Sequence, residues 1–120
     1  MPNSIARGQI FDVDWSPGRG SEQTGVRPAL VVQNNVGNGV ISYPMTIVLA
    51  LSTRLRGYPS TVRIEPTDEN GLDASSEVNT GQIMTVAKSR LISMRGFLSV
   101  DDMKKVEEKL AYMLGLKLAD

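Results

Sequence analysis

The stretch Met45-Thr-Ile-Val-Leu-Ala-Leu51 is the most apolar part of this 120-residue chain, and the polar residues Ser52 and Thr53 follow it directly. A short apolar run of this kind is typical of a strand that is buried on both faces of a sheet. The segment Ala29-Leu-Val-Val-Gln33 has the same character, so we expect a second central strand there. Polar side chains that leave a buried strand lie at the rim of the core on a rigid support, where functional sites form.

Alternating apolar and polar residues predict further short strands on both sides of these two. In the segment 8–15, Phe11 and Val13 lie on one face and Asp12 on the other. Residues 34–39 have the composition of a turn. The expected strands cover residues 8–15, 29–33, 45–51, 61–65, 76–86 and 91–95, the fifth being either continuous or broken near Gly81 into two short strands.

A helix is expected at the end of the sequence. Ser99 is a suitable N-cap, and Asp102 stands three residues later in the capping-box position. Gly115 is suited to end the helix. Apolar residues recur between these two points at helical spacing and predict one buried stripe. The stripe consists of Met103, Val106, Leu110, Met113 and Leu114.

Short strands followed by one helix predict a mainly β (α+β) fold. With about six strands, the expected architecture is a small, strongly curved β-barrel with the helix laid across it. The length indicates a single domain over residues 1–120, because typical domains contain about 100–150 residues.

The composition excludes several classes of chemistry. The chain contains no cysteine, which rules out a disulfide framework, a thiolate metal site and a cysteine nucleophile. It contains no histidine either, and this excludes zinc enzymes that depend on histidine, Ser-His-Asp hydrolases and ribonucleases with a histidine pair. No apolar run approaches the roughly 18–20 residues that cross a bilayer, and the first residues do not resemble a signal peptide. We therefore expect a soluble, cytoplasmic protein.

The formal net charge is zero, with 13 basic and 13 acidic residues, but the charges are unevenly distributed. Residues 1–63 carry six arginines and three acidic residues, a balance of +3, whereas all lysines fall at residue 88 or later. Arginine is the side chain best suited to bidentate contacts with phosphate. The alternative is a solvated surface with a local bias in charge.

Two polar segments gather the groups that remain for chemistry, namely residues 20–28 and residues 52–54. The first of these segments carries a strong resemblance. Its neighbourhood is similar to the opening of the MazF/PemK toxins, in which a strand is followed by G-[SH]-E-Q-x-G-x-R-P-V-L-V. The matching residues are Arg7-Gly8-Gln9-Ile10, Pro17, Gly20-Ser-Glu-Gln23, Gly25-Val-Arg-Pro28 and Leu30-Val-Val-Gln-Asn34. The similarity continues through Thr46-Ile-Val48, Ser52-Thr53, Gly57-Tyr-Pro59, Gln82-Ile83, Thr85-Val86 and Arg90-Leu91.

This resemblance implies the toxin of a type II toxin–antitoxin system, built as a homodimer on an SH3-like barrel of the PemK/CcdB type. Its activity would be that of a sequence-specific, metal-independent endoribonuclease, or mRNA interferase, that needs no cofactor. It would cleave single-stranded RNA by attack of the 2′-hydroxyl, leaving a 2′,3′-cyclic phosphate and a 5′-hydroxyl. The partners would be RNA and a cognate MazE-like antitoxin that blocks the RNA groove, with no membrane partner.

The resemblance also suggests catalytic residues. Arg27 matches the catalytic arginine of the family, and such a charge stabilises the phosphorane that builds up during attack. Ser52 stands where the family usually has a catalytic threonine, and Thr53 beside it is a second candidate. Glu22 is either the general base or a partner that orients Arg27. The structural alternatives are a surface ion pair between Arg27 and Glu22 and strand-end hydroxyls that bond backbone groups.

The expected RNA-binding residues are Ser21, Gln23, Arg54 and Gln82, because polar side chains read the exposed edges of unpaired bases. The alternative is ordinary loop polarity. Two positions depart from the family pattern. Gly81 replaces a frequent acidic residue, and Met84 replaces a frequent arginine. We therefore expect a recognition sequence different from, or looser than, the ACA motif of some relatives.

Two other functions remain open at this point. CcdB-like toxins share the barrel but bind DNA gyrase, and this activity would not require Arg27 or Ser52. A catalytically degenerate relative would retain only antitoxin binding, and Ser52 and Gly81 are the features that favour it.

Overall fold

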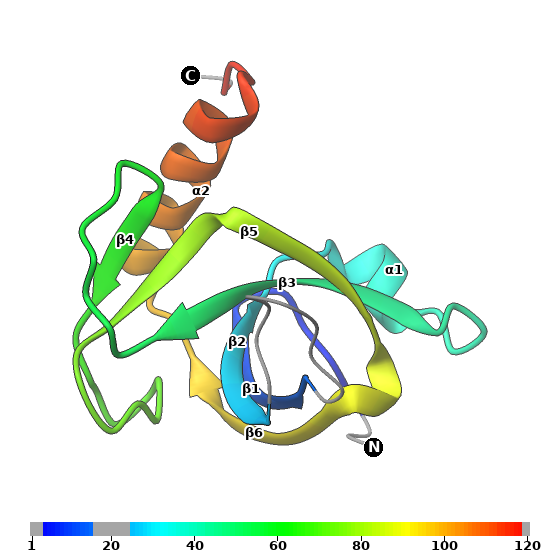
Figure 1. Ribbon diagram of the computed structural model, residues 1–120. Coiled ribbons are helices and arrows are strands. Elements are labelled where there is room, and N and C mark those ends of the chain that lie inside the picture. The colour runs from blue at the N-terminus through cyan, green and yellow to red at the C-terminus, as the bar shows by residue number, and fades with distance from the viewer. Residues whose placement is uncertain (1–3, 16–24, 119–120) are drawn as a thin grey trace.

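One antiparallel sheet forms most of the structure, a computed structural model that describes residues 4–15 and 25–118 (Figure 1). All of the strand pairs in this part of the chain are antiparallel. The elements are β1 (Gln9–Asp14), β2 (Val26–Val31), α1 (Asn35–Gly39), β3 (Met45–Ser52), β4 (Thr61–Ile64), β5 (Ser76–Ala87), the 3-10 helix η1 (Lys88–Arg90), β6 (Leu91–Phe97) and α2 (Val100–Leu114).

The strand order β4-β5-β3-β2-β1-β6 places β2 and β3 in the centre of the sheet, as their apolar sequences predict. Side chains of these strands are buried on both faces. One face carries a core cluster around Phe11, Val31 and Val48. The other carries a second cluster around Leu30 and Leu49, and α2 covers it through Val106. Figure 1 shows α2 beside β4 and β5, at one end of the curved sheet.

The sheet curves strongly but does not close into a barrel, because β4 and β6 are its two edges. The mainly β fold with a strongly curved sheet and a C-terminal helix is therefore confirmed, and the sheet is not closed. The pairing of β1 with β6 is irregular at two points, between Ile10 and Phe11 and between Asp12 and Val13. Such bulges bend a strand and increase its twist, and they explain the curvature at this edge.

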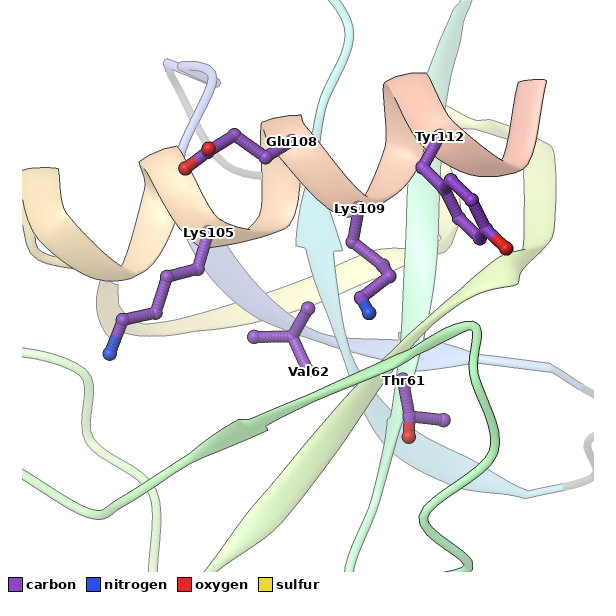
Figure 2. Close-up of a pocket in the computed structure, with 6 residues that line it drawn as sticks. All are labelled: Thr61, Val62, Lys105, Glu108, Lys109 and Tyr112. Carbon is purple, nitrogen blue, oxygen red and sulfur yellow. The ribbon is translucent and has the colours of Figure 1, made fainter. Parts of the chain in front are cut away.

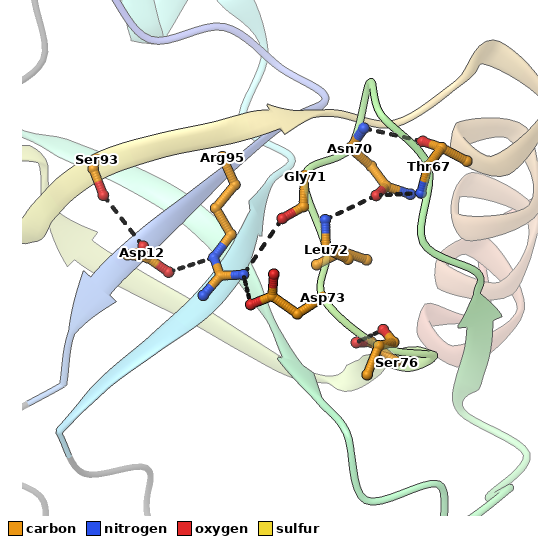
Figure 3. Close-up of polar contacts among 10 residues, drawn as sticks. Asp12, Thr67, Asn70, Gly71, Leu72, Asp73, Ser76, Ser93 and Arg95 are labelled. Carbon is orange, nitrogen blue, oxygen red and sulfur yellow. Dashed lines mark hydrogen bonds and ion pairs between the residues drawn. The ribbon is translucent and has the colours of Figure 1, made fainter.

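The segment between β4 and β5 covers part of the β6 edge. The backbone N–H of Phe97 donates to the carbonyl oxygen of Glu69 at 2.9 Å. The contact is so close that a Cβ atom on Gly96 would lie 2.0 Å from that carbonyl oxygen. Arg95 on β6 donates to Asp73 of the same segment at 3.2 Å and to Asp12 on β1 at 2.7 Å, and so links the segment to the sheet (Figure 3). The segment between β4 and β5 thus protects the edge strand β6, which would otherwise expose its backbone groups.

Several boundaries differ from the sequence expectation. Residues 35–39 form the short helix α1 rather than a simple turn, because the Asn34 side chain caps it by accepting a hydrogen bond from the Gly37 N–H at 3.0 Å. The strand β2 begins at Val26, three residues earlier than expected. The strand β5 is continuous, and the disturbance near Gly81 is an irregularity in its pairing with β3.

The helix α2 begins and ends where the sequence predicts. The Ser99 hydroxyl accepts from the Asp102 N–H at 3.0 Å, and Gly115 is the C-cap with φ = 70°. The expected apolar stripe is only partly buried, however, since Met113 and Leu114 at its C-terminal end are exposed. Along the described part of the chain, no helix has both the length and the apolar character that crossing a bilayer requires.

Candidate active site at one end of the sheet

Three neighbouring strands, β2, β3 and β5, place candidate side chains at one end of the sheet. Ser52, the last residue of β3, is the cross-strand partner of Glu77 on β5. On its other side, β3 pairs with β2 so that Ala50 faces Ala29. Arg27 lies two residues before Ala29 on β2, and Ser52 lies two residues after Ala50 on β3, so both residues lie at the same end of the sheet. Arg27 is the cross-strand partner of Val13 on β1. Cross-strand partners such as Ser52 and Glu77 project from the same face of a sheet.

Arg27 therefore lies within β2, where its backbone position is fixed by the sheet, and its side chain is exposed. Its expected companion Ser52 is half-buried, and its Oγ accepts a hydrogen bond from the Arg54 N–H at 3.0 Å. A hydroxyl that accepts in this way keeps its own proton to donate to another group. Thr53 and Arg54 are both exposed and follow Ser52 directly. This end of the sheet thus carries the guanidinium of Arg27 and the hydroxyl donor of Ser52 at the rim of the core.

Glu77 is the residue at this end of the sheet that the sequence did not single out. It is buried, with 6% of its surface exposed, although it carries a carboxylate. Its Oε1 accepts from the Arg56 N–H at 3.0 Å, and its Oε2 accepts from the Gly57 N–H at 3.2 Å. The available sequence signal was a single acid between Ser76 and Val78 at the start of a strand. That signal alone does not distinguish a buried carboxylate from a solvated one.

The loop that follows Ser52 carries an arginine and an aromatic ring that the sequence analysis also passed over. The Arg56 guanidinium lies over the Tyr58 ring, 6.0 Å from its centroid. Tyr58 is exposed, so the pair presents a cation and a flat surface to solvent. Such pairs suit single-stranded nucleic acid, because bases stack on aromatic rings and on guanidinium planes.

Gln82 lies on the irregular part of β5. Asn79 Oδ1 accepts from the Gly81 N–H and from the Ser60 hydroxyl, both at 2.9 Å, and these bonds hold the chain where it departs from regular pairing. A Cβ atom on Gly81 would lie 3.1 Å from Asn79 Oδ1, so this turn of the strand favours glycine. Gln82 is exposed there, next to Ile83, which is the cross-strand partner of Leu49 on β3.

The second departure from the family pattern, Met84 in place of a frequent arginine, is explained by packing. Met84 is partly buried and packs against the first core cluster. A long charged side chain at this position would require a different arrangement of that core. Gly81 and Met84 therefore both have a structural role in β5.

Three of the predicted site residues, Ser21, Glu22 and Gln23, lie outside the described residues. The described residues that flank this segment are joined, because the Trp15 N–H donates to the Gly25 carbonyl oxygen at 2.9 Å. Gly25 directly precedes β2, the strand that carries Arg27.

A separate cavity of about 410 Å³ lies between α2 and β4 and contains none of the predicted site residues (Figure 2). Lys109 points from α2 toward β4, and its Nζ lies 6.0 Å from the centroid of the Tyr112 ring. The cavity is lined by Thr61, Val62, Lys105, Glu108, Lys109 and Tyr112.

Within residues 4–15 and 25–118, no three acidic side chains lie together in a way that could hold a metal ion.

Comparison with solved structures gives close matches over the whole chain. The chain is similar to an endoribonuclease from Mycobacterial species in complex with its cognate antitoxin, with 28% identity, 98% of this chain and 100% of that chain covered, and a TM-score of 0.76. It is also similar to MazF from Deinococcus radiodurans, with 26% identity, 96% and 100% coverage, and a TM-score of 0.78. A MazE–MazF structure from Deinococcus radiodurans shares the fold at 22% identity, with 97% and 100% coverage and a TM-score of 0.74.

The family comparison agrees with these structures. Residues 6–114 match the family described as the PemK-like, MazF-like toxin of type II toxin–antitoxin systems. The match includes every described element and the segment between β1 and β2. The chain therefore belongs to the PemK-like, MazF-like family of toxins of type II toxin–antitoxin systems.

Proposed function

We propose that this protein is a sequence-specific endoribonuclease that cleaves single-stranded RNA and is neutralised by a cognate antitoxin. The observation that supports the proposal is that Arg27 on β2 and Ser52 on β3 lie at the same end of the sheet, each two residues beyond the pair Ala29–Ala50. These residues occur in a chain of the toxin family, with 28% identity to an endoribonuclease of similar fold. A toxin that acts by binding another protein would not need this pair of side chains.

The proposed reaction is an internal phosphoryl transfer. The ribose 2′-oxygen attacks the adjacent phosphorus and loses its proton, while the bond from phosphorus to the 5′-oxygen breaks. The 5′-oxygen gains a proton, so the products are a 2′,3′-cyclic phosphate and a 5′-hydroxyl. Negative charge builds on the non-bridging oxygens during attack, and fixed donors aimed at those oxygens lower the barrier.

Arg27 supplies the fixed positive charge in this mechanism, and its place in the sheet holds its backbone rigid. Ser52 donates its hydroxyl proton to a phosphate oxygen, since its own oxygen already accepts from the Arg54 N–H. Thr53 offers a second hydroxyl beside it. Glu22 is our candidate for the base that takes the 2′-proton, on sequence grounds.

RNA on either side of the cleaved bond is proposed to follow the polar residues around this end of the sheet. Arg54 supplies a phosphate contact next to Ser52, and Gln82 reads a base edge from β5. Ser21 and Gln23 are assigned the same kind of contact from the segment beside Arg27. The Arg56–Tyr58 pair adds a surface on which an unpaired base can stack.

The remaining parts of the proposal concern the assembly. We assign residues 1–120 to a single toxin domain that forms a homodimer and acts in the cytoplasm. The antitoxin is expected to be acidic and partly disordered, and to fold as it binds. The similar endoribonuclease from Mycobacterial species is found with its cognate antitoxin, which supports this pairing.

The test is incubation of the purified, antitoxin-free protein with a long RNA of mixed sequence, followed by identification of the new 5′ ends. The proposal expects 5′-hydroxyl ends at one short recurrent motif. Cleavage at ACA alone would contradict the expected change in specificity. Intact RNA would contradict the nuclease assignment, and a gyrase cleavage assay would then distinguish a gyrase poison from a protein that only binds its antitoxin.

A further inference from the structure

The first half of the loop that connects β3 to β4 is held at two points by side chains of the candidate site. At its start, the Ser52 hydroxyl accepts from the Arg54 N–H at 3.0 Å. Two residues later, the Glu77 carboxylate accepts from the Arg56 N–H at 3.0 Å and the Gly57 N–H at 3.2 Å. Ser52 and Glu77 are themselves cross-strand partners, so one pair across the sheet holds this part of the loop.

The second fastening has the form of an anion-binding nest. Gly57 is in the left-handed region with φ = 66°, and its N–H points together with that of Arg56 toward one acceptor. Successive backbone N–H groups in such a turn form a concave site that binds anions. Here the anion is the chain's own carboxylate, and it is buried beneath the loop with 6% of its surface exposed.

The carboxylate stabilises this loop conformation. Hydrogen bonds from N–H groups to a carboxylate are roughly twice as strong as bonds between neutral groups. If the acceptor is removed, the N–H groups of Arg56 and Gly57 lose their charged partner and are left to bond water, since both residues are exposed. The loop then gains freedom at Arg56 and Gly57, and the Arg54 segment next to Ser52 shifts with it.

We infer that Glu77 is a positioning residue for RNA cleavage, which fixes the Arg54–Gly57 turn so that Ser52 and Arg54 face the scissile phosphate. The inference rests on the proposed nuclease function. Glu77 touches neither RNA nor the reacting atoms, and it acts through the two backbone N–H groups that it holds. Because it arranges groups that stabilise the transition state, its loss lowers kcat more than it raises KM.

The test uses chemical rescue of the full chain. In Glu77→Ala the nest is empty, and acetate is small enough to supply a carboxylate to the same two N–H groups. We expect kcat for a short RNA substrate to fall about 10- to 100-fold, the range for a misplacement of about 1 Å at a catalytic site. Added acetate should recover at least a third of the lost activity, whereas chloride at equal ionic strength should not. Glu65→Ala is the matched control, because Glu65 is an exposed acid just after β4 that pairs with Arg63, two residues earlier.

A second measurement does not depend on cleavage of RNA. Trypsin cuts after arginine, so the rate of cutting after Arg54 and Arg56 reports the order of the turn. We expect faster cutting in Glu77→Ala, protection of that variant by acetate, and no change in Glu65→Ala. Glu77→Gln keeps the size and one oxygen acceptor, and it should show an intermediate effect. If Glu77→Ala does not fold, Glu77→Gln replaces it in the kinetic and trypsin comparisons without acetate, because its amide fills the space that acetate would occupy. Unchanged kcat and unchanged cutting in that variant would then overturn the inference.

The outcomes separate this inference from the proposed function. If the wild-type protein cleaves RNA but Glu77→Ala keeps kcat within twofold, the inference is wrong and the function stands. A loss that acetate does not restore in a folded variant also overturns it. If the wild-type protein leaves RNA intact, both fail as statements about catalysis, and the trypsin assay still decides whether Glu77 holds the turn.

Discussion

Ser52 and Glu77 face each other across β3 and β5, at the point where the most apolar strand of the chain ends. One side chain of this pair keeps a hydroxyl proton available at the rim of the core, and the other is buried beneath the loop that follows. Arg27 lies on β2, the other neighbour of β3, two residues before the partner of Ala50. A charge, a hydroxyl and a loop anchor therefore lie at one end of the sheet.

Replacing Arg27 by alanine should abolish RNA cleavage and leave the fold intact. Loss of one fixed donor to a developing oxyanion costs about 100- to 1,000-fold in kcat, and loss of a full charge should cost at least as much. The side chain is exposed, so the free energy of unfolding should change by only about 0.5 kcal/mol. Cleavage kinetics and urea denaturation measure the two effects.

The matched control for that variant is Arg63→Ala. Arg63 is exposed, lies on β4 as the cross-strand partner of Glu77, and pairs with Glu65 at 3.0 Å. Its loss should change kcat by less than about threefold, because the ion pair is at the surface. Equal losses in both variants would mean that general positive charge, rather than Arg27, supports cleavage.

Ser52 should be necessary through its hydroxyl rather than through its size. Ser52→Ala removes the donor and should lower kcat by about 100-fold. Ser52→Thr restores the residue usual in the family and restricts rotation about χ1, so its activity should equal or exceed that of the wild type. Full activity in Ser52→Ala would assign the role to Thr53, and Thr53→Ala would then be the inactive variant.

A Cβ atom at Gly96 should destabilise the protein, since it would overlap the backbone of Glu69 and Asn70. We expect Gly96→Ala to lower the free energy of unfolding by about 1–3 kcal/mol through overpacking. Gly39→Ala is the control, because the corresponding Cβ would meet no atom within 4 Å. Thermal denaturation of both variants checks the comparison, and equal stabilities would mean that the 66–73 segment does not rest on β6.

Arg95 on β6 should stabilise the fold mainly through its hydrogen bond to Asp12 on β1. The Asp12 hydrogen bond raises the pKa of Arg95, and a raised pKa gives a stabilisation that is complete below the ordinary arginine value and lost only as pH rises through the raised one. The contribution of Arg95 protonation should therefore be constant from neutral to mildly alkaline pH. Asp12→Asn should cost about 1–2 kcal/mol. Asp73→Asn should cost less than about 0.5 kcal/mol, because the Asp73 side chain is 91% exposed. Denaturation across this pH range tests both statements.

The sequence predicts the sheet well where a pattern depends on neighbouring residues. The strands at 45–51 and 29–33 were found from apolar runs, and the ends of α2 from Ser99 and Gly115. The helix α1 was missed because its cap, Asn34, is equally suited to a turn. The sequence does not say which strands form the edges of the sheet, because that depends on which strands meet, and no local pattern records it.

In the candidate site too, residues in a local pattern were proposed from the sequence, whereas a residue that depends on distant contacts was not. Ser52 was found because it ends a buried strand, and Arg27 because it matches a family motif. Glu77 was not found, since its importance comes from a register that pairs it with Ser52 and from a loop that returns to it. Contacts between segments about 20 residues apart require the fold itself.

The measurement that tests the central claim most directly is cleavage of a long mixed-sequence RNA by the wild-type protein and by Arg27→Ala, in EDTA, with sequencing of the 5′-hydroxyl ends. The account predicts recurrent cuts at one short motif by the wild-type protein and none by the variant. Cleavage should persist in EDTA, because the chain has no histidine or cysteine and its described residues contain no cluster of three acidic side chains suited to a metal. Equal cleavage by the two proteins, or intact RNA with a folded wild-type protein, would contradict it.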